Sequence, residues 1–327
     1  SSFVTVWSRR RRQAGPVIVI VCPGQGSQTP GFLSPWLELP GLRDQLSALS
    51  DAAQVDLVAH GTTSDEETIK DTAVAQPLLV GAGLLALRAL GGGTTVTDAV
   101  PQSGAIAGHS VGEITAAAGA GVLSEKAAME FVALRGRAMA QASAATPTGM
   151  SAVLGGDQGT VLATIGRHLL TPANVNGAGQ VVAAGSLPAL AELAADPPAR
   201  ARVIPLKVAG AFHTHYMEPA VAVLRAAAAD HEVADPEVTL VSNRDGQVVT
   251  DGRTVLDRLV AQVSNPVRWD LCMERFTALG VTAIIELPPA GTLIGLAKRA
   301  LKGVELLAVK TPDDLDAART LIKEHSA

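Results

Sequence analysis

A serine lies between two glycines in the run Gly108-His-Ser110-Val-Gly112. An apolar segment, residues 105–107, precedes this run and an alanine-rich segment follows it, which predicts a strand, a tight turn and a helix. In such a nucleophile elbow the glycines relieve crowding, the serine hydroxyl is exposed above the sheet, and the next N–H group faces a developing oxyanion. The pattern therefore predicts nucleophilic acyl chemistry at Ser110, with the N–H of Val111 as an oxyanion donor.

A serine nucleophile needs a base that accepts its proton near neutral pH, and histidine is the usual choice. His213 and His215 lie where an apolar loop leads into a predicted helix, and periodicity alone does not decide between them. His109 neighbours the serine and therefore points elsewhere, and the other four histidines have polar or helical surroundings: His60, His168, His231 and His325. The acid of a hydrolase triad is not apparent, because the candidates fall in a separate predicted module: Asp157 and Asp196.

The composition suits a compact enzyme with one large domain. The chain has 327 residues, of which 47% are hydrophobic and 17% charged, so it can bury a sizeable core and is unlike a disordered segment. Aromatic residues make up only 3%, which leaves no stacking platform for nucleic acid bases. The net charge of -5, with no long basic block beyond residues 9–12, argues against nucleic acid or a membrane surface as a partner.

The cysteines and the N-terminal segment concern the cellular location of the protein. Cys22 and Cys272 form no C-x-x-C pair, so we expect no metal site, no disulfide and no cofactor, and a reducing cytoplasm is the simplest setting. The apolar run at residues 17–22 is too short to span a membrane. Residues 1–15 differ from the rest and are interpreted as a leader or tag outside the fold. The lack of a zipper pattern favours a monomer.

Short apolar, β-branched runs alternate with helical patterns through most of the chain. Strands are expected at residues 16–22, 105–107, 238–242, 281–287 and 306–309, and helical patterns at 42–90, 124–142, 213–229, 254–263, 269–279, 292–301 and 313–324. Parallel-type strands that alternate with helices predict an α/β three-layer domain formed by residues 16–143 and 208–327.

The pattern changes between the two parts of this domain. Residues 144–207 read as a strand at 150–154, a helix at 159–170, a strand at 173–184, a helix at 187–195 and a strand at 201–206. This succession predicts a small ferredoxin-like subdomain inserted in the larger domain.

Further short motifs occur in a fixed order along the chain. They are Pro23-Gly-Gln-Gly-Ser-Gln28, Ala75-Gln-Pro77, Gly108-His-Ser-Val-Gly-Glu113, Leu134-Arg-Gly136, Asn174-Val-Asn176, Gly179-Gln-Val-Val182, Ala211-Phe-His-Thr214, Asn265-Pro-Val-Arg-Trp269, and Gly291 with Leu293. Together they resemble the blocks of malonyl-CoA:acyl carrier protein transacylases, over residues 17 to about 310. The resemblance implies an α/β-hydrolase-like domain with an inserted ferredoxin-like subdomain, in agreement with the fold predicted above.

The resemblance also assigns roles to matching positions. It implies that Ser110 is the acylated nucleophile and that His213, rather than His215, is its base. In the family a main-chain carbonyl orients the histidine in place of a carboxylate, and the matching position is Gln262. The two oxyanion N–H groups are expected from Gln25 and Val111. Arg135, which the usual exposure of arginine side chains would place on a solvated face, matches the arginine that binds the malonyl carboxylate.

Other matching positions concern the acyl group. Phe212 and Val111 follow the pattern of malonyl-selective members, whereas Ala211 stands where the full malonyl signature has histidine, so the match is partial. An extra methyl group changes selectivity by only about 1–3 kcal/mol, so strict exclusion of methylmalonyl is not implied. The remaining positions expected to bind substrate are His109, Met139, Asn174 and Asn176.

The implied partners are malonyl-CoA and holo acyl carrier protein, in fatty acid synthesis or in a polyketide pathway. Carrier proteins are acidic and this chain is acidic too, so docking requires a local basic patch. The positions suggested for it, which are equally compatible with ordinary solvated side chains, are Arg200, Arg202, Lys298, Arg299 and Lys302.

Two other classes of protein compete with this interpretation. A serine esterase or thioesterase would have an acidic partner for His213 and no buried arginine, and the sequence supports neither feature. A non-catalytic acyl-binding protein would have lost the nucleophile or the base, yet both are present.

Overall fold

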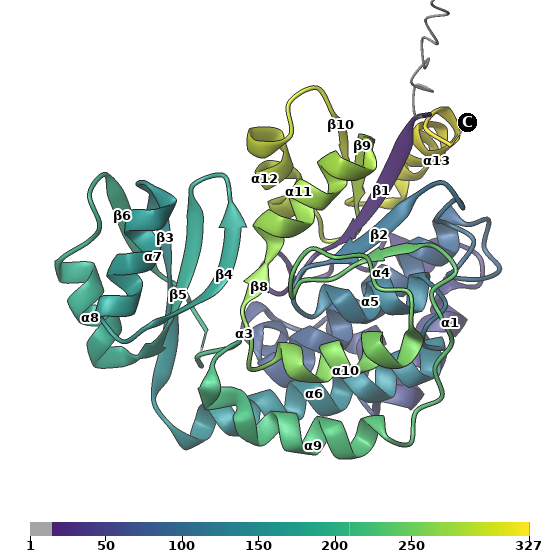
Figure 1. The fold of residues 1–327 in the computed structure, drawn as a ribbon. Coiled ribbons are helices and arrows are strands. Elements are labelled where there is room, and N and C mark those ends of the chain that lie inside the picture. The colour runs from purple at the N-terminus through teal and green to yellow at the C-terminus, as the bar shows by residue number, and fades with distance from the viewer. Residues whose placement is uncertain (1–14, 209, 327) are drawn as a thin grey trace, which may run out of the picture.

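The computed structural model describes residues 15–208 and 210–326, and in this part of the chain the elements form two sheets with helices around them (Figure 1). Nearly all of the predicted leader, residues 1–14, lies outside the described residues. The chain has a mixed α/β fold.

The larger sheet is entirely parallel. Its strands are β1 (Val17–Cys22), β2 (Ala105–Gly108), β7 (Thr239–Val241), β9 (Val281–Glu286) and β10 (Glu305–Ala308), in the order β10-β9-β1-β2-β7. In β1, Ile18 and Ile20 face one hydrophobic cluster while Val19 and Val21 face another. Both faces of the sheet are therefore buried, which explains the continuous apolar runs in the sequence.

Helices cover each face of this sheet. On one side lie α1 (Leu42–Ala53), α4 (Thr72–Leu90), α5 (Gly112–Gly119), α6 (Glu125–Ala145), α9 (Glu218–Ala228), α10 (Gly252–Gln262) and α13 (Leu315–Glu324). On the other side lie α11 (Trp269–Leu279) and α12 (Thr292–Ala300). Helix α4 is long and apolar enough to cross a membrane by length and composition, but 83% of it is buried inside the fold, as in a core helix of a globular protein.

The helical pattern predicted for residues 42–90 is divided into four helices. Between α1 and α4 lie α2 (Leu57–Thr62) and α3 (Glu66–Lys70), each opened by an aspartate that accepts a main-chain N–H: Asp56, Asp65 and, for α4, Asp71. These caps satisfy N–H groups that have no partner within a helix, so they mark helix starts that apolar periodicity does not show. Short 3-10 helices lie at Trp36–Glu38, His215–Met217 and Pro312–Asp314.

The smaller sheet is formed by β3 (Thr148–Gly155), β4 (Thr171–Gly177), β5 (Gln180–Ser186) and β6 (Ala201–Pro205), with α7 (Gln158–Arg167) and α8 (Leu187–Ala195) between them along the chain. Its order is β6-β3-β5-β4-β8, and the first four strands pair antiparallel. The prediction of a single strand at residues 173–184 was wrong, because left-handed backbone at Gly177, Ala178 and Gly179 turns the chain into a hairpin.

One strand of the smaller sheet comes from outside residues 144–207. Strand β8 (Val267–Arg268) pairs in parallel with β4, at Asn174 and Val175. This strand lies within the Asn-Pro-Val-Arg-Trp motif, so main-chain hydrogen bonds join this motif to the smaller sheet.

Candidate active site

The turn between β2 and α5 holds Ser110 in left-handed backbone, at φ 53°. A Cβ atom at Gly108 would lie 2.0 Å from the main chain of Gly112, and one at Gly112 would lie 2.1 Å from the carbonyl oxygen of Cys22. Only glycine fits at both positions. The Ser110 N–H donates to Oδ1 of Asn243 at 2.9 Å, which holds this strained residue in place.

We expect Gly108→Ala to destabilise the protein by roughly 3 kcal/mol or more, because the added methyl group meets fixed main chain rather than a movable side chain. Thermal unfolding measures this loss of stability. Gly166→Ala is the matched control, since Gly166 lies in α7 with open space around it and alanine favours a helix. Equal stability of the two variants would contradict the expectation.

A histidine lies beside the serine. The Nε2 atom of His213 is 2.7 Å from Oγ of Ser110, and its Nδ1 atom is 2.8 Å from the main-chain oxygen of Gln262. Because Nδ1 faces a carbonyl, it carries the proton and donates it, which leaves the Nε2 lone pair toward the serine. His215 is exposed and stacks on Tyr216, with ring centroids 4.2 Å apart, so it does not approach Ser110.

The imidazole of His213 is kept neutral by its surroundings. Burial, the nearby Arg135 guanidinium and His109 lower the pKa of His213 to about 3, against the opposing effect of its hydrogen bond to Gln262. A neutral imidazole at working pH is the form that accepts a proton from a hydroxyl group.

The guanidinium of Arg135, on α6, is buried beside the serine and is 1% exposed. Its Nη1 atom donates to Oε1 of Gln76 at 2.7 Å, and its Nη2 atom donates to Oε1 of Gln262 at 2.8 Å and contacts Oγ of Ser110 at 3.4 Å. Burial lowers the pKa of Arg135 to about 10, so it remains a cation. These described partners are all neutral, and a buried cation without a carboxylate partner favours binding of an anion.

These groups line a cavity of about 100 Å³. Its walls are formed by Gln25, Gln76, His109, Ser110, Val111, Arg135, Met139, Met150, Asn174, Leu206, Val208, Phe212 and His213. Among the predicted substrate residues, His109, Met139, Asn174 and Phe212 thus lie at the cavity, and Asn176 lies behind His109, with its Oδ1 atom 2.8 Å from the histidine Nε2. Oδ1 of Asn174 is buried and has no partner among the described residues, so it is free to accept a hydrogen bond from a ligand.

The two predicted oxyanion donors also lie at this cavity. Gln25 follows β1 and Val111 precedes α5, and among the described hydrogen bonds none uses the main-chain N–H of either residue. Two free N–H groups beside a serine hydroxyl suit a tetrahedral oxyanion.

The five predicted docking residues are exposed but do not lie in one group. Lys298, Arg299 and Lys302 are at the end of α12, which packs near β4, whereas Arg200 and Arg202 are at β6, on the opposite edge of the smaller sheet.

The sequence did not identify three polar residues that hold the site together. Gln76, in the Ala-Gln-Pro motif, fixes one end of Arg135. Asn243 is fully buried after β7, and its side chain bridges Ser110 N–H and the carbonyl of Gly108. Glu113 is buried on α5 and accepts from the Asn243 N–H at 2.9 Å and from Nε2 of Gln262. Asn243 could have been found in the sequence, because Ser242 and Asn243 form a polar pair at the carboxyl end of a strand.

Burial raises the pKa of Glu113 to about 7, although its hydrogen bonds to Asn243 and Gln262 and the charges of Arg135 and Arg258 oppose the shift. The thiol of Cys272, whose own pKa is raised by burial and by Glu113, also lies nearby. A carboxyl whose pKa is higher in the folded than in the unfolded protein binds its proton more tightly in the folded state. Its contribution to stability is therefore present at low pH and is lost as the pH rises through about 7.

We expect Glu113→Gln to gain stability relative to the native protein as the pH rises from about 5 to about 8, by roughly 2–3 kcal/mol. Glutamine does not titrate, and His213 titrates in both proteins and cancels from the difference. Urea unfolding of both proteins at the two pH values measures the change. A stability difference that is the same at both values would show that Glu113 has an ordinary pKa.

The chain is similar to known proteins over nearly its whole length. Residues 19–325 match the family model of the acyl transferase domain. The malonyl CoA-acyl carrier protein transacylase of Mycobacterium tuberculosis is 54% identical over 305 residues, which cover 93% of this chain and 100% of that protein. The crystal structure of MCAT from Mycobacterium tuberculosis has a TM-score of 0.87 at 54% identity and covers 93% of this chain and 99% of that one. A type II PKS acyl-carrier protein in complex with its malonyl-transacylase includes a chain with a TM-score of 0.84 and 29% identity, over 94% of this chain and 99% of that chain.

A family match over nearly the entire chain, on a fold that joins a serine and a histidine above a parallel sheet, defines an acyltransferase. The extent of the sequence identity and of the structural overlap assigns the chain to one family within this class. The chain belongs to the malonyl CoA-acyl carrier protein transacylases.

Proposed function

We propose that Ser110 takes the malonyl group from malonyl-CoA and passes it to the phosphopantetheine thiol of an acyl carrier protein. In the first step Oγ of Ser110 attacks the thioester carbon while Nε2 of His213, 2.7 Å away, accepts the hydroxyl proton. The C–S bond of the tetrahedral intermediate then breaks, His213 returns the proton to the sulfur, and CoA leaves. The product of this half-reaction is a malonyl-serine ester.

The second half-reaction reverses the first with a different thiol. The carrier thiol loses its proton to His213 and attacks the ester, the C–O bond to Ser110 breaks, and the proton goes to the serine oxygen. In both halves the negative oxygen of the intermediate accepts from the main-chain N–H groups of Gln25 and Val111, which border the cavity. The main-chain oxygen of Gln262 keeps His213 in the tautomer that both steps require.

The observation that carries the malonyl assignment is the Arg135 guanidinium. It is buried at the cavity, is held by neutral amide oxygens, and contacts Oγ of Ser110 at 3.4 Å. A carboxylate that enters the cavity next to the acyl carbon supplies the missing anion and can accept two hydrogen bonds. An acyl group that lacks this carboxylate leaves the guanidinium uncompensated.

An acyl carrier protein is proposed as the acceptor because a structurally similar malonyl-transacylase forms a complex with one. Of the suggested basic residues, those at the end of α12 share a helix with Thr292, whose side chain contacts Ser27 in the loop after β1. We expect charge reversal at Arg299 to raise the KM for the carrier protein several-fold, with KM for malonyl-CoA unchanged. Reversal at Arg202, on the far edge of the smaller sheet, is the matched comparison, and equal behaviour of the two variants would remove α12 from the docking surface.

We further infer that residues 144–207 form a ferredoxin-like subdomain, with an α/β-hydrolase-like domain around it. The order β-α-β-β-α-β along the chain and the antiparallel order β6-β3-β5-β4 support this inference. A cytoplasmic location is proposed from the two buried free thiols of Cys22 and Cys272.

Intact mass spectrometry after brief incubation with malonyl-CoA tests the proposed function. We expect one malonyl adduct per chain, which disappears when holo acyl carrier protein is added while malonylated carrier forms. Release of free malonate without a carrier would favour a thioesterase. The absence of both adduct and malonate would show that the acyl donor is another compound.

A further inference from the structure

A buried carboxylate lies beneath the cavity and takes no direct part in the proposed reaction. Glu113 is on the first turn of α5, behind the elbow, and both of its oxygens accept hydrogen bonds. One accepts from the main-chain N–H of Asn243 at 2.9 Å and the other accepts from Nε2 of Gln262. Burying a charge in this way costs free energy unless hydrogen bonds or an opposite charge compensate it.

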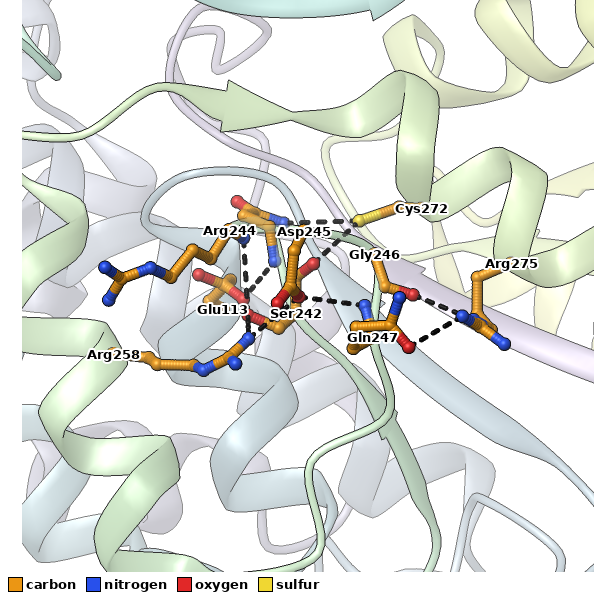
Figure 2. A network of polar contacts seen from close by, with 10 residues as sticks. Glu113, Ser242, Arg244, Asp245, Gly246, Gln247, Arg258, Cys272 and Arg275 are labelled. Carbon is orange, nitrogen blue, oxygen red and sulfur yellow. Dashed lines mark hydrogen bonds and ion pairs between the residues drawn. The ribbon is translucent and has the colours of Figure 1, made fainter.

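The loop that carries Asn243 is held from several elements. Arg258, on α10, donates to Oγ of Ser242 at 3.1 Å and to Oδ1 of Asp245 at 2.8 Å. Arg275, on α11, donates to the carbonyl of Gly246 at 2.9 Å. Figure 2 shows Glu113 beside this loop. The side chains of Arg258 and Arg275 extend to the loop from two different helices. The N–H of Asn243 is therefore a fixed donor that Glu113 must satisfy.

The second partner of Glu113 is a side-chain amide whose orientation matters for Arg135. The Nε2 end of Gln262 donates to Glu113 and to the main-chain oxygen of Ser110 at 3.0 Å. With its NH2 group directed there, the Oε1 end faces Arg135 and accepts from Nη2 at 2.8 Å. Glu113 thus acts on the guanidinium through one intervening amide, and its negative charge also opposes the lowering of the Arg135 pKa by burial.

We propose that Glu113 is a positioning residue for recognition of the malonyl carboxylate, acting through the side chain of Gln262 on Arg135. This inference rests on the proposed function, in which Arg135 binds that carboxylate. It assigns to Gln262 a second task, performed by its side chain, beside the contact of its main-chain oxygen with His213.

A glutamine at position 113 offers one acceptor oxygen to two donors. The N–H of Asn243 cannot turn, because it belongs to the fixed loop, so it keeps that oxygen. The new NH2 group then faces Nε2 of Gln262, and two donors repel each other. The Gln262 amide either turns its oxygen toward position 113 or moves away, and in both cases its oxygen no longer holds Nη2 of Arg135.

The test compares acyl-enzyme formation from malonyl-CoA and from acetyl-CoA, whose acyl group has no carboxylate. We expect Glu113→Gln to lower kcat/KM for malonyl-CoA by roughly 10- to 50-fold and for acetyl-CoA by less than about threefold. Glu130→Gln, the same change at an exposed position of α6, should leave both values unchanged. Equal losses for the two substrates would show a merely structural role and overturn the proposal, and so would the absence of a loss.

Two further variants separate the possible failures. If Arg135→Met does not lower malonyl use selectively, the proposed function fails, whatever Glu113→Gln does. If Arg135→Met is selective, adding Glu113→Gln to it should change the malonyl-to-acetyl ratio no further, because both act on one contact. Should Glu113→Gln not fold, Gln262→Met removes the side-chain contact between Glu113 and Arg135 but keeps the main-chain oxygen that contacts His213. An equal loss of kcat/KM for malonyl-CoA and acetyl-CoA in that variant overturns the proposal.

Discussion

Ser110→Ala is expected to carry no malonyl adduct after incubation with malonyl-CoA and to transfer malonyl groups at least about 10⁴-fold more slowly than the native protein. The reason is that Oγ of Ser110 is the atom proposed to form the ester, 2.7 Å from the base. Among the described residues that line the cavity, no other has a hydroxyl or thiol group. Intact mass measures the adduct, and a carrier-protein assay measures the transfer.

The fold should tolerate this substitution. Serine and alanine have the same Cβ atom, so the left-handed backbone at position 110 costs both residues about the same. The Asn243 contact is to the main-chain N–H and survives the change. Ser47→Ala, at an exposed position of α1, is the matched control and should be acylated like the native protein. An adduct that persists in Ser110→Ala would move the nucleophile to another residue.

The parts of the molecule that could be predicted from the sequence are those fixed by local interactions. The elbow is an example, because its two glycines are required within a few residues of the serine and leave a pattern in the sequence. The buried strand at residues 17–22 is another, since a strand covered on both faces must be apolar throughout. In these cases the physical requirement restricts the residue types at neighbouring positions, so it can be recognised in the sequence.

Other parts depend on contacts between distant segments. Asn243 and Ser110 are 133 positions apart, and Arg135 and Gln262 are 127 apart, so no local pattern links them. The oxygen that orients His213 belongs to the main chain, which every residue type possesses, so only the family resemblance indicated Gln262. The usual exposure of arginine side chains likewise suggested a solvated Arg135, because a tendency of the residue type cannot show that a cavity lies at that position.

The hairpin at residues 171–186 shows a different limit. Its turn contains Ala178, a non-glycine residue in left-handed backbone at φ 52°, flanked by Gly177 and Gly179, with Asn176 before them and Gln180 after them. The Asn176-Gly177 dipeptide is typical of a hairpin turn, so the sequence carried a turn signal that the prediction of a single strand at residues 173–184 did not use. The pairing of Val175 with Val181 across the hairpin agrees with this turn signal.

Arg135→Met is expected to lower kcat/KM for malonyl-CoA by roughly 100- to 1,000-fold and to change kcat/KM for acetyl-CoA by less than about threefold. Methionine fills most of the arginine volume but has no donor, so the malonyl carboxylate would be buried without a cation or a hydrogen bond. The loss corresponds to about 3–4 kcal/mol, the cost typical of removing one member of a buried charged pair. Acyl-enzyme formation from the two acyl-CoA compounds, followed by intact mass, measures both rates.

Arg137→Met is the matched control, because Arg137 lies two residues further along α6 and its side chain is exposed. Two residues along a helix turn a side chain to the opposite face, so this variant removes a cation from solvent and leaves the cavity intact. Both variants lower the net charge equally, and any general electrostatic effect on the negatively charged CoA appears in both. A malonyl-specific loss in Arg135→Met alone therefore assigns selectivity to the buried guanidinium, whereas similar losses in the two variants would assign it to the overall charge of the protein.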